Sequence, residues 1–280
     1  MAVADIQVRK KMITGINIFL EHIYDVCKQR SMSLEQALTA ARGFGYSGLE
    51  CDMWRLSERS ARELFARCGL HAESVYCGFD FAHDERERSL ARIEECLDTA
   101  AYYGARKVLA IPGFAENADE LSRVAERLTE MCRSAASRGI TVSVEDYDDS
   151  RSPCSTSEKL LYLLENAEGL RITFDTGNFA YSLEDAGEAF GRLSPYIAHV
   201  HLKDRVYARI CEGDDGKADV SGRMMYPCPV GSGSVDVRGI VARLTQSGWN
   251  GSLSAEHFGA ADQLSCMERS AAFIRGLVEV

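Results

Sequence analysis

Prolines and long apolar runs are scarce in this sequence. Five prolines in 280 residues, with no low-complexity tract, argue against a long disordered linker. No stretch approaches the roughly 18 apolar residues of a membrane-spanning helix. The apolar run MITGINIFL near the N-terminus is shorter still and lacks a small-residue cleavage site. We therefore expect a soluble, cytoplasmic protein with no membrane partner.

Basic residues are also in deficit. The chain has 32 Lys and Arg against 42 Asp and Glu, which gives a formal net charge of −10. Non-specific binding of nucleic acid depends on neutralising phosphates with Lys and Arg. The charge balance therefore argues against a nucleic-acid partner.

Cysteine pairs of the CxxC type are absent, although the chain has ten cysteines. The cysteines are scattered, and several fall inside apolar patterns of helical or strand-like period. In a chain of this length, that distribution predicts reduced thiols in the core of a cytosolic protein rather than a disulfide framework.

Short apolar runs of strand length alternate along the chain with longer stretches of helical period. The short runs predict eight strands, at 13–19, 46–54, 71–79, 106–113, 140–147, 171–178, 197–204 and 251–258. The longer stretches predict eight helices, at 33–45, 57–69, 84–105, 118–139, 155–169, 183–196, 235–248 and 262–280. Most of these helices end at a Gly directly before the next strand, where a left-handed cap favours Gly.

Eight β/α units in a chain of this length predict a (β/α)8 TIM barrel. We expect a single domain over residues 1–280, with its barrel core at about 13–275. The alternative is an open, doubly wound sheet, but no GxGxxG follows the first strand as its dinucleotide-binding version would require. Residues 205–234 form a long connection after the seventh strand, and loops of this length in compact domains are usually functional.

Ligand-type side chains recur where the last four predicted strands end: Glu145, Asp175, His201 and Glu256. In a TIM barrel these strand ends meet at one face, where active sites lie. Three carboxylates so close together repel one another unless they are protonated, separated or neutralised. Two Glu, one Asp and one His suit Mn²⁺, Mg²⁺ or Co²⁺, with Zn²⁺ as a further choice. Each residue alone also fits a plainer role, such as a helix cap at Asp175, but the joint pattern favours a metal site.

The motifs VSVEDY, ITFDTGN, HVHLKD, PVGSGSVD and SLSAEH follow one another in this order. With them, the chain resembles the xylose isomerase-like TIM-barrel superfamily, the sugar phosphate isomerases and epimerases grouped with AP endonuclease family 2. The resemblance implies that Glu145, Asp175, His201 and Glu256 hold one divalent metal, most often Mn²⁺. It also implies a small-molecule carbohydrate substrate and, in many members, a homo-oligomer.

The reaction that the resemblance implies is proton transfer next to a metal-bound carbonyl, through a metal-stabilised enediolate. Glu145 and Glu256 would be the catalytic pair, one removing the α-proton and the other returning a proton. A sugar isomerase or epimerase is the first hypothesis. An inosose-type dehydratase or a C-glycoside-cleaving lyase on the same site is the alternative. A non-catalytic barrel that binds sugar or metal is an alternative of another class.

Further polar residues near the same strand ends are candidates for substrate binding: Lys203, Asn178, Arg205, Glu50 and Trp54. Lys203 would either reach a substrate oxygen or pair with Asp204 or another carboxylate. Trp54 would either stack on a sugar face or pack at the rim of the barrel.

Two further histidines lie beside the expected ligands. Family precedent favours His201 of HVHLKD as the ligand, and we expect His199 on the opposite face of this strand, behind the barrel wall or supporting a ligand. His257 directly follows Glu256, so alternation along the strand predicts that its side chain points away from the metal.

Several positions depart from the pattern of related enzymes. Ketose 3-epimerases of this superfamily carry Glu, His and Arg where this chain has Arg151, Asn178 and Tyr207, which argues against a free-ketohexose 3-epimerase. In the turn at 231–233, Ser232 replaces an acidic residue that the family often has. The backbone N–H groups there either form a plain turn or favour an anionic group of the substrate. The small number of histidines argues against the multi-metal site of an AP endonuclease.

Overall fold

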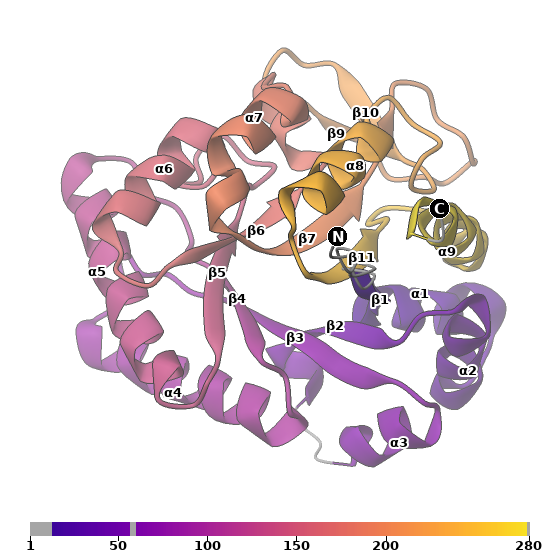
Figure 1. Ribbon diagram of the computed structural model, residues 1–280, viewed down its shortest axis with the longest axis horizontal. Helices are drawn as coiled ribbons and strands as arrows, with labels where there is room; N and C mark the ends of the chain where they lie inside the picture. Colours follow the sequence, from indigo (N-terminus) through magenta and orange to yellow (C-terminus); the bar gives the residue numbers. More distant parts are fainter. Residues whose placement is uncertain (1–12, 57–59, 279–280) are drawn as a thin grey trace, which may run out of the picture.

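A closed barrel of eight parallel strands forms the centre of the molecule (Figure 1). The computed structural model describes residues 13–56 and 60–278. The strands follow the order β1-β11-β7-β6-β5-β4-β3-β2 around the barrel. They are β1 (Ile13–Phe19), β2 (Gly48–Asp52), β3 (His71–Gly78), β4 (Lys107–Ile111), β5 (Thr141–Glu145), β6 (Arg171–Asp175), β7 (Ile197–Lys203) and β11 (Gly251–Glu256). The predicted (β/α)8 barrel is confirmed, with all eight of its strands.

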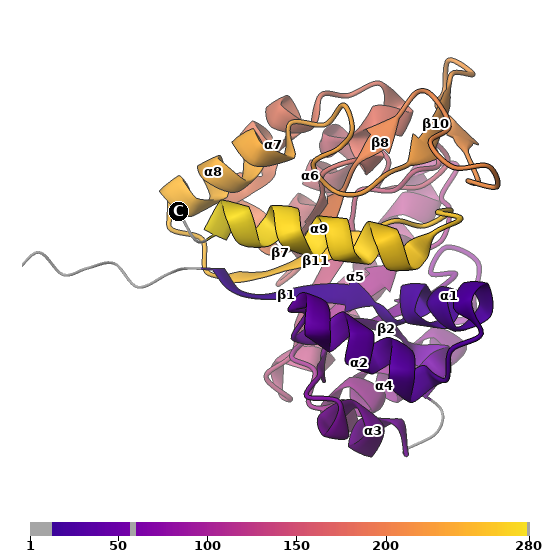
Figure 2. The same ribbon diagram turned by 90° about the vertical axis from the view of Figure 1, so that its right-hand side faces the viewer.

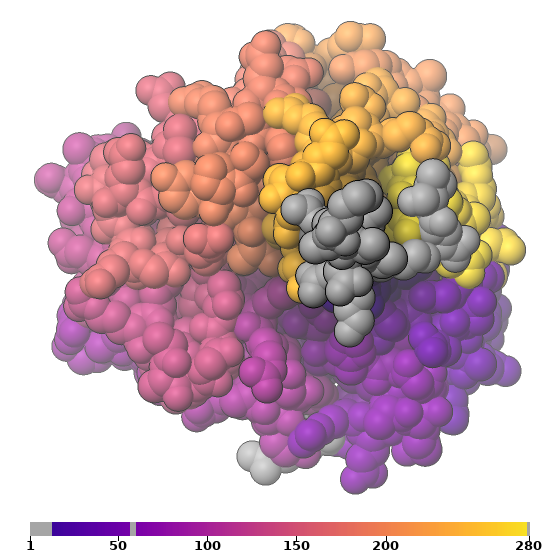
Figure 3. Space-filling model, in the orientation of Figure 1, coloured from indigo at the N-terminus to yellow at the C-terminus, as the bar shows by residue number. Residues whose placement is uncertain are grey.

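Helices surround the barrel and cover the outer face of its sheet (Figure 1). They include the eight predicted ones: α2 (Leu34–Phe44), α3 (Ala61–Arg67), α4 (Arg86–Tyr103), α5 (Ala118–Ala136), α6 (Ser157–Asn166), α7 (Ala186–Leu193), α8 (Val237–Ser247) and α9 (Gln263–Val278). The predicted start of the 57–69 helix, residues 57–59, lies outside the described residues, as do residues 279–280. Figure 3 shows the first and last parts of the chain, indigo and yellow, side by side, where α9 packs against α2.

One helix was not expected from the sequence. α1 (Leu20–Arg30) directly follows β1, so the first β/α unit has two helices. Its apolar buried residues, Leu20, Ile23 and Val26, form a narrow stripe on an otherwise polar helix, so the helical period is weak there. The helix ends at Ser31 in the left-handed conformation (φ 53°). The Gly stop signal that marks the end of most other helices is therefore missing here.

The start and stop of α2 show how the sequence fixes these helices. Ser33 Oγ accepts the backbone N–H of Gln36 at 3.2 Å, and Gln36 Oε1 accepts the N–H of Ser33 at 2.8 Å. This capping box satisfies two backbone donors that the first helical turn leaves without partners. At the other end, Gly45 adopts φ 106°, a conformation that a residue with a Cβ rarely takes.

The two faces of the barrel sheet carry opposite kinds of side chain, because alternate residues of a strand point to opposite sides. The residues that face the helices are apolar and buried, as are Val142 and Val144 of β5. Many of the residues between them face the barrel axis and are polar, as is Ser143, whose hydroxyl lies 2.7 Å from that of Thr173 on β6. Although some inward residues are apolar, such as Leu109, the axis is more polar than in barrels where branched aliphatic residues dominate.

The long connection at 205–234 carries a small sheet of its own. Its strands β8 (Arg205–Val206), β9 (Lys217–Ala218) and β10 (Met224–Pro227) pair antiparallel in the order β8-β10-β9. Figure 2 labels β8 and β10, and Figure 1 labels β9 and β10. β8 begins just after β7 ends, so the sheet lies at the carboxyl end of the barrel, where active sites occur in this fold.

Asp204 holds the two ends of this connection together. Its buried carboxylate accepts four backbone N–H groups, from Arg205, Gly231, Gly233 and Val235, at 2.7 to 3.1 Å. A Cβ atom at position 233 would collide with this carboxylate, so the close approach requires glycine. Of the two alternatives for this turn, the structure shows the plain turn, because Asp204 already accepts the N–H groups of Gly231 and Gly233.

The state of the cysteines and the character of the helices match two expectations from the sequence: unpaired thiols and no membrane-spanning segment among the described residues. All ten cysteines are unpaired, and six of them are buried. Over residues 13–56 and 60–278, no helix combines the length and the apolar character needed to cross a membrane.

The end of the barrel opposite the long connection contains a half-buried ion pair. Lys107 Nζ of β4 lies 2.5 Å from Glu73 Oε1 of β3, which also accepts a hydrogen bond from Ser252 Oγ at 2.6 Å. His71 Nε2 lies 3.1 Å from Glu73 Oε2. Burial by itself raises the pKa of Glu73, but these three neighbours outweigh it and lower the pKa to about 2. Glu73 is therefore an anion in the folded protein at neutral pH.

We predict that Glu73→Gln lowers the free energy of unfolding at pH 7 by about 3 kcal/mol. This is the free energy that corresponds to the difference in the pKa of Glu73 between the unfolded and the folded chain. Because the pKa is lowered on folding, this stability is present above pH 4.5 and is lost as the pH falls towards 2. Urea denaturation followed by circular dichroism should show the gap between wild type and variant narrowing over that range. Glu35→Gln, at an exposed carboxylate of α2, is the control. A gap that does not change with pH would contradict the prediction.

Candidate metal centre and active site

Four strand ends converge on one point at the mouth of the barrel. Glu145 ends β5, Asp175 ends β6, Glu256 ends β11, and His201 lies two residues before the end of β7. Each offers one ligand atom, and these atoms all lie within 4.8 Å of one another. The parallel register accounts for this, because Asp175 lies directly beside His201 across β6 and β7. Asp175, His201 and Glu256 are buried, and Glu145 is half-buried.

Asp175 acts as a cap and still has an oxygen to offer. Its Oδ1 accepts the backbone N–H groups of Gly177 and Asn178, both at 2.7 Å, and so fixes the turn that follows β6. Its Oδ2 is buried and has no hydrogen-bond partner. A buried carboxylate oxygen without a partner is costly unless a cation lies next to it.

His201 stands between the carboxylates. Its Nδ1 lies 2.5 Å from Glu145 Oε1 and 3.7 Å from Glu256 Oε2, and its Nε2 lies 3.7 Å from Glu50 Oε2. Burial lowers the pKa of His201, but Glu145 and Glu50 outweigh this effect and raise the pKa well above its usual value. The imidazole therefore holds a proton that partly neutralises its acidic neighbours.

The same four residues fit a divalent cation. Burial raises the pKa of Asp175 to about 8 and also raises that of Glu145, so a nearby cation would stabilise both carboxylates. Three carboxylates and one imidazole are donors that Mn²⁺, Mg²⁺ and Co²⁺ accept. A divalent ion would take over the neutralising role of the proton on His201. The arrangement can therefore hold one metal ion.

Lys203 supplies a second positive charge on the same face of β7. Its ammonium contacts Glu256 Oε1, donates to Asn178 Oδ1 at 2.7 Å and lies 3.9 Å from Asp175 Oδ2. Burial lowers the pKa of Lys203, but Asp175 and Glu256 outweigh this and raise it above its usual value. Of the two expectations for Lys203, the structure shows an ion pair, with Glu256 rather than Asp204 as its partner.

His199 shares the inner face of β7 with His201, so the expectation that the two lie on opposite faces is wrong. Residues i and i+2 of a strand point to the same side, and the two ring centroids are 5.3 Å apart. Lys107 Nζ lies 3.1 Å from His199 Nδ1, and an ammonium can only donate, so Nδ1 accepts. The other nitrogen, Nε2, then donates to Glu50 Oε1 at 2.7 Å.

Glu50 lies beneath the metal centre and does not line the pocket above it. It is fully buried, with one oxygen on His199 and the other 3.7 Å from His201. Burial raises the pKa of Glu50, but the two histidines outweigh this and hold it well below its usual value. These three residues also form a cluster of metal-ligand type. The ammonium of Lys107 next to His199 disfavours a cation there, so we interpret Glu50 as the group that orients both rings.

A pocket of about 270 Å³ opens above the metal centre. Of the predicted substrate-binding residues, Lys203, Asn178 and Arg205 line it. Its opposite wall is aromatic and includes Phe19 and Phe258, whose rings pack edge to face with centroids 5.2 Å apart. The sequence analysis did not single out these two aromatic residues, although Phe19 ends β1 and Phe258 lies two residues beyond the end of β11.

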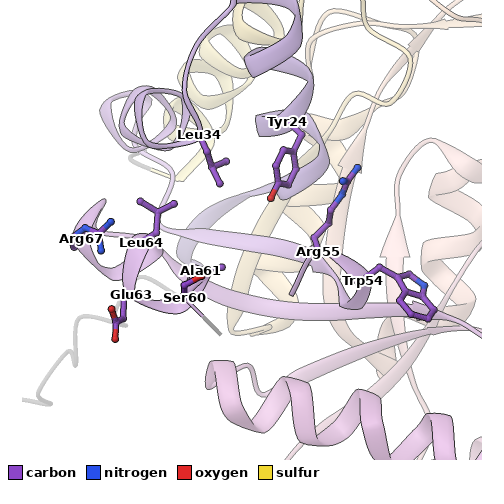
Figure 4. A pocket seen from close by; sticks show the side chains of 9 residues that line it. All are labelled: Tyr24, Leu34, Trp54, Arg55, Ser60, Ala61, Glu63, Leu64 and Arg67. Atoms are coloured by element: carbon purple, nitrogen blue, oxygen red, sulfur yellow. The ribbon is translucent and has the colours of Figure 1, made fainter. Parts of the chain in front are cut away.

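Trp54 lies outside this pocket. Its indole is 60% exposed and lines a separate pocket between α1, α2 and α3, together with Tyr24 and Arg55 (Figure 4). Figure 4 shows the indole pointing away from Tyr24. The guanidinium carbon of Arg92 lies 4.7 Å from the centroid of the indole ring. The expectation of a sugar-stacking wall is not met. β2 ends at Asp52 and a short 3₁₀ turn follows, so strand alternation no longer places the side chain at 54.

His257 is turned away from the metal centre, towards the outer helices. Its backbone N–H donates to His22 Nε2 of α1 at 2.9 Å, and its own Nε2 lies 2.7 Å from Ser270 Oγ of α9. Burial lowers the pKa of His257 to about 3, so the ring is neutral. It joins β11 to two helices.

Asp146 is a buried carboxyl group that the sequence analysis passed over. Its Oδ1 accepts the backbone N–H of Asp175 at 2.9 Å, and its backbone oxygen accepts Asn178 Nδ2 at 2.8 Å. Burial, together with Asp175 and Glu145, raises the pKa of Asp146 well above its usual value. Through the bond to the backbone N–H of Asp175, Asp146 supports Asp175 from behind. Asp146 belongs to the acidic run VEDYDD, and the sequence alone does not show which acidic residue of this run is buried.

Comparison with known proteins agrees with this architecture. The chain matches the model of the xylose isomerase-like TIM barrel family over residues 38–277. It belongs to this family.

One relative and two solved structures illustrate the similarity. The uncharacterized protein YihM of Escherichia coli (strain K12) is 28% identical, over 78% of this chain and 68% of YihM. The probable 3-DHS dehydratase AsbF of Bacillus anthracis superposes with a TM-score of 0.73 at 15% identity, over 94% of this chain and 99% of AsbF. An L-ribulose 3-epimerase superposes with a TM-score of 0.72 at 20% identity, over 95% of each chain. The two structures show that the fold is shared.

We predict that Glu50→Gln weakens the binding of Mn²⁺ by about 10- to 100-fold, the usual cost of losing a group that orients a metal ligand. Gln has the size of Glu50 but carries no negative charge, so it cannot attract and orient the rings of His199 and His201 as the carboxylate does. Isothermal titration calorimetry of metal-free protein with Mn²⁺ measures this. Glu21→Gln is the control, because Glu21 is also a partly buried carboxylate but contacts Tyr76 and Arg55 instead. Equal affinity in wild type and Glu50→Gln would contradict the orienting role.

Proposed function

We propose that this protein is a divalent-metal-dependent enzyme that transfers a proton next to the carbonyl group of a sugar or related polyhydroxy compound, as an isomerase or epimerase. The observation that supports it most is the meeting of Glu145, Asp175, His201 and Glu256 within 4.8 Å at the barrel mouth. The names of its structural neighbours, an epimerase and a probable dehydratase, are consistent with this chemistry.

Glu145, Asp175, His201 and Glu256 would hold the metal, with Mn²⁺ as the expected ion. Bound there, the metal would polarise the carbonyl and the neighbouring hydroxyl of the substrate and so acidify the proton between them. The ammonium of Lys203 pairs with the carboxylate of Glu256, and Asn178 Oδ1 accepts a hydrogen bond from the same ammonium.

Glu145 and Glu256 are the two candidates for proton transfer. They stand on β5 and β11, with β6 and β7 between them in the barrel, so they approach a ligand in the pocket from different directions. Both line the pocket. One carboxylate can therefore remove a proton while the other delivers one to a different face or carbon of the same molecule.

The positions that differ from ketose 3-epimerases also argue in the structure against a free-ketohexose 3-epimerase. Arg151 pairs with Asp149 and its side chain is 63% exposed, and Tyr207 is 43% exposed. Neither lines the pocket. Only Asn178 reaches it, as the partner of Lys203. We therefore propose a substrate other than a free ketohexose.

We predict that Glu145→Gln and Glu256→Gln each lower the rate of proton exchange by at least about 10²- to 10⁴-fold, because general acid–base groups usually contribute this much. The assay follows deuterium incorporation from D2O into sugars, sugar acids and sugar phosphates by NMR, with and without Mn²⁺. Removal of metal with a chelator should stop exchange, and added Mn²⁺ should restore it. Glu94→Gln on the exposed surface of α4 is the control.

The products distinguish the related reactions. Deuterium uptake without loss of water supports isomerisation or epimerisation, whereas net loss of water indicates a dehydratase on the same site. Exchange that proceeds equally well in both Gln variants would contradict the proton-transfer role. Metal binding without any turnover across the panel would indicate a non-catalytic sugar-binding barrel.

A further inference from the structure

Arg205 is a buried cation without an acidic partner. The residue is 5% exposed, and it lines the pocket above the metal centre. Nη1 donates to the backbone oxygen of Phe258 at 3.2 Å, and Nε is buried with no hydrogen-bond partner. Within the part of the chain that the structure describes, no carboxylate lies within the 4.0 Å of an ion pair. A buried guanidinium in this state is costly unless a ligand completes it.

The other charges of the pocket already have partners. A divalent ion together with Lys203 would balance the three carboxylates of the metal centre. Asp148, which also lines the pocket, pairs with Lys217 Nζ at 2.7 Å. Arg205 therefore leaves the pocket with one positive charge in excess. A ligand with a single negative charge would complement it.

The surroundings of Arg205 favour a carboxylate over a phosphate. A phosphate is usually cradled by several backbone N–H groups at a turn or helix start. The turns at 177–178 and 231–233 offer no free N–H groups of this kind, because Asp175 and Asp204 already accept them. One guanidinium, by contrast, matches the two oxygens of a carboxylate in charge and in shape. The pocket volume, about 270 Å³, also suits a compact ligand.

We propose that the substrate is a sugar acid or a related polyhydroxy carbonyl compound with a carboxylate, and that Arg205 binds this carboxylate. This inference rests on the proposed function, because it names the substrate class for the same pocket. Arg205 fixes the distal end of the molecule, and its carbonyl end then lies towards Glu145 and Glu256.

The test compares ligands that share one frame and differ at one group. D-Glucuronate, D-glucose and D-glucose 6-phosphate form one such set, and D-galacturonate, D-galactose and D-galactose 6-phosphate form another. Binding to the full chain in saturating Mn²⁺ is measured by calorimetry, which requires no turnover. We expect the acids to bind more tightly than the neutral sugars. Arg205→Met should reduce acid binding by about 10- to 100-fold, as expected for a charge-assisted bidentate contact.

Two further variants separate recognition from folding. Arg205→Lys keeps the positive charge but loses the planar guanidinium that can donate two parallel hydrogen bonds. We expect this variant to retain part of the affinity for the acids. Arg209→Met removes an exposed arginine of the same connection, which stacks on Tyr226, and should leave binding unchanged. Thermal unfolding of each variant checks that it is folded.

The outcomes are distinct. Failure of both acids to bind, or equal binding of acid and neutral sugar, overturns the proposal, as does unchanged acid affinity in a folded Arg205→Met variant. Preference for the phosphates overturns it in favour of a phosphorylated substrate. If the enzyme turns over neutral sugars, the proposed reaction is supported and the proposed substrate class is contradicted. Acid binding without turnover leaves the ligand class standing without the reaction.

Discussion

The need to pair charges along the axis of the barrel governs this structure. Polar side chains face inwards from every strand of the site, so the interior holds ionisable groups where other barrels hold aliphatic ones. These groups contact one another in a connected series: His71, Glu73, Lys107, His199, Glu50, His201 and Glu145. Apart from His71 and Glu73, which share β3, successive members come from different strands. At its lower end this series is balanced by protein groups alone. At its upper end acidic groups are in excess, and that excess makes the mouth a cation site.

The sequence predicted the parts of this arrangement that depend on period and on strand ends. Alternation of short and long apolar patterns was enough for the eight strands and eight helices, and the parallel barrel then brought Glu145, Asp175, His201 and Glu256 together without further assumption. The helix α1 was missed because its buried stripe is narrow and it ends at Ser31 instead of glycine. The small sheet in the long connection was missed because strands of two to four residues carry no readable period.

Side-chain placement was predictable only within regular strands. His257 is placed by alternation from Glu256, whereas the error at His199 came from counting, since positions two apart share a face. Trp54 stands after a turn, where no such counting applies. The partners of Lys203 and Arg205 depend on which carboxylates lie nearby in space. No pattern in the sequence distinguishes Glu256, which pairs with Lys203, from Asp204, which does not.

Asp204 gives the long connection a property of its own. A single carboxylate clamps the first residue after β7 to the residues that lead into α8, so the chain leaves and re-enters the barrel at almost the same place. What lies between these two points can change in length and composition while the clamp and the barrel stay as they are. Through evolution, this segment can therefore be exchanged like a module, and the enclosure above a constant metal centre can be remodelled for new ligands.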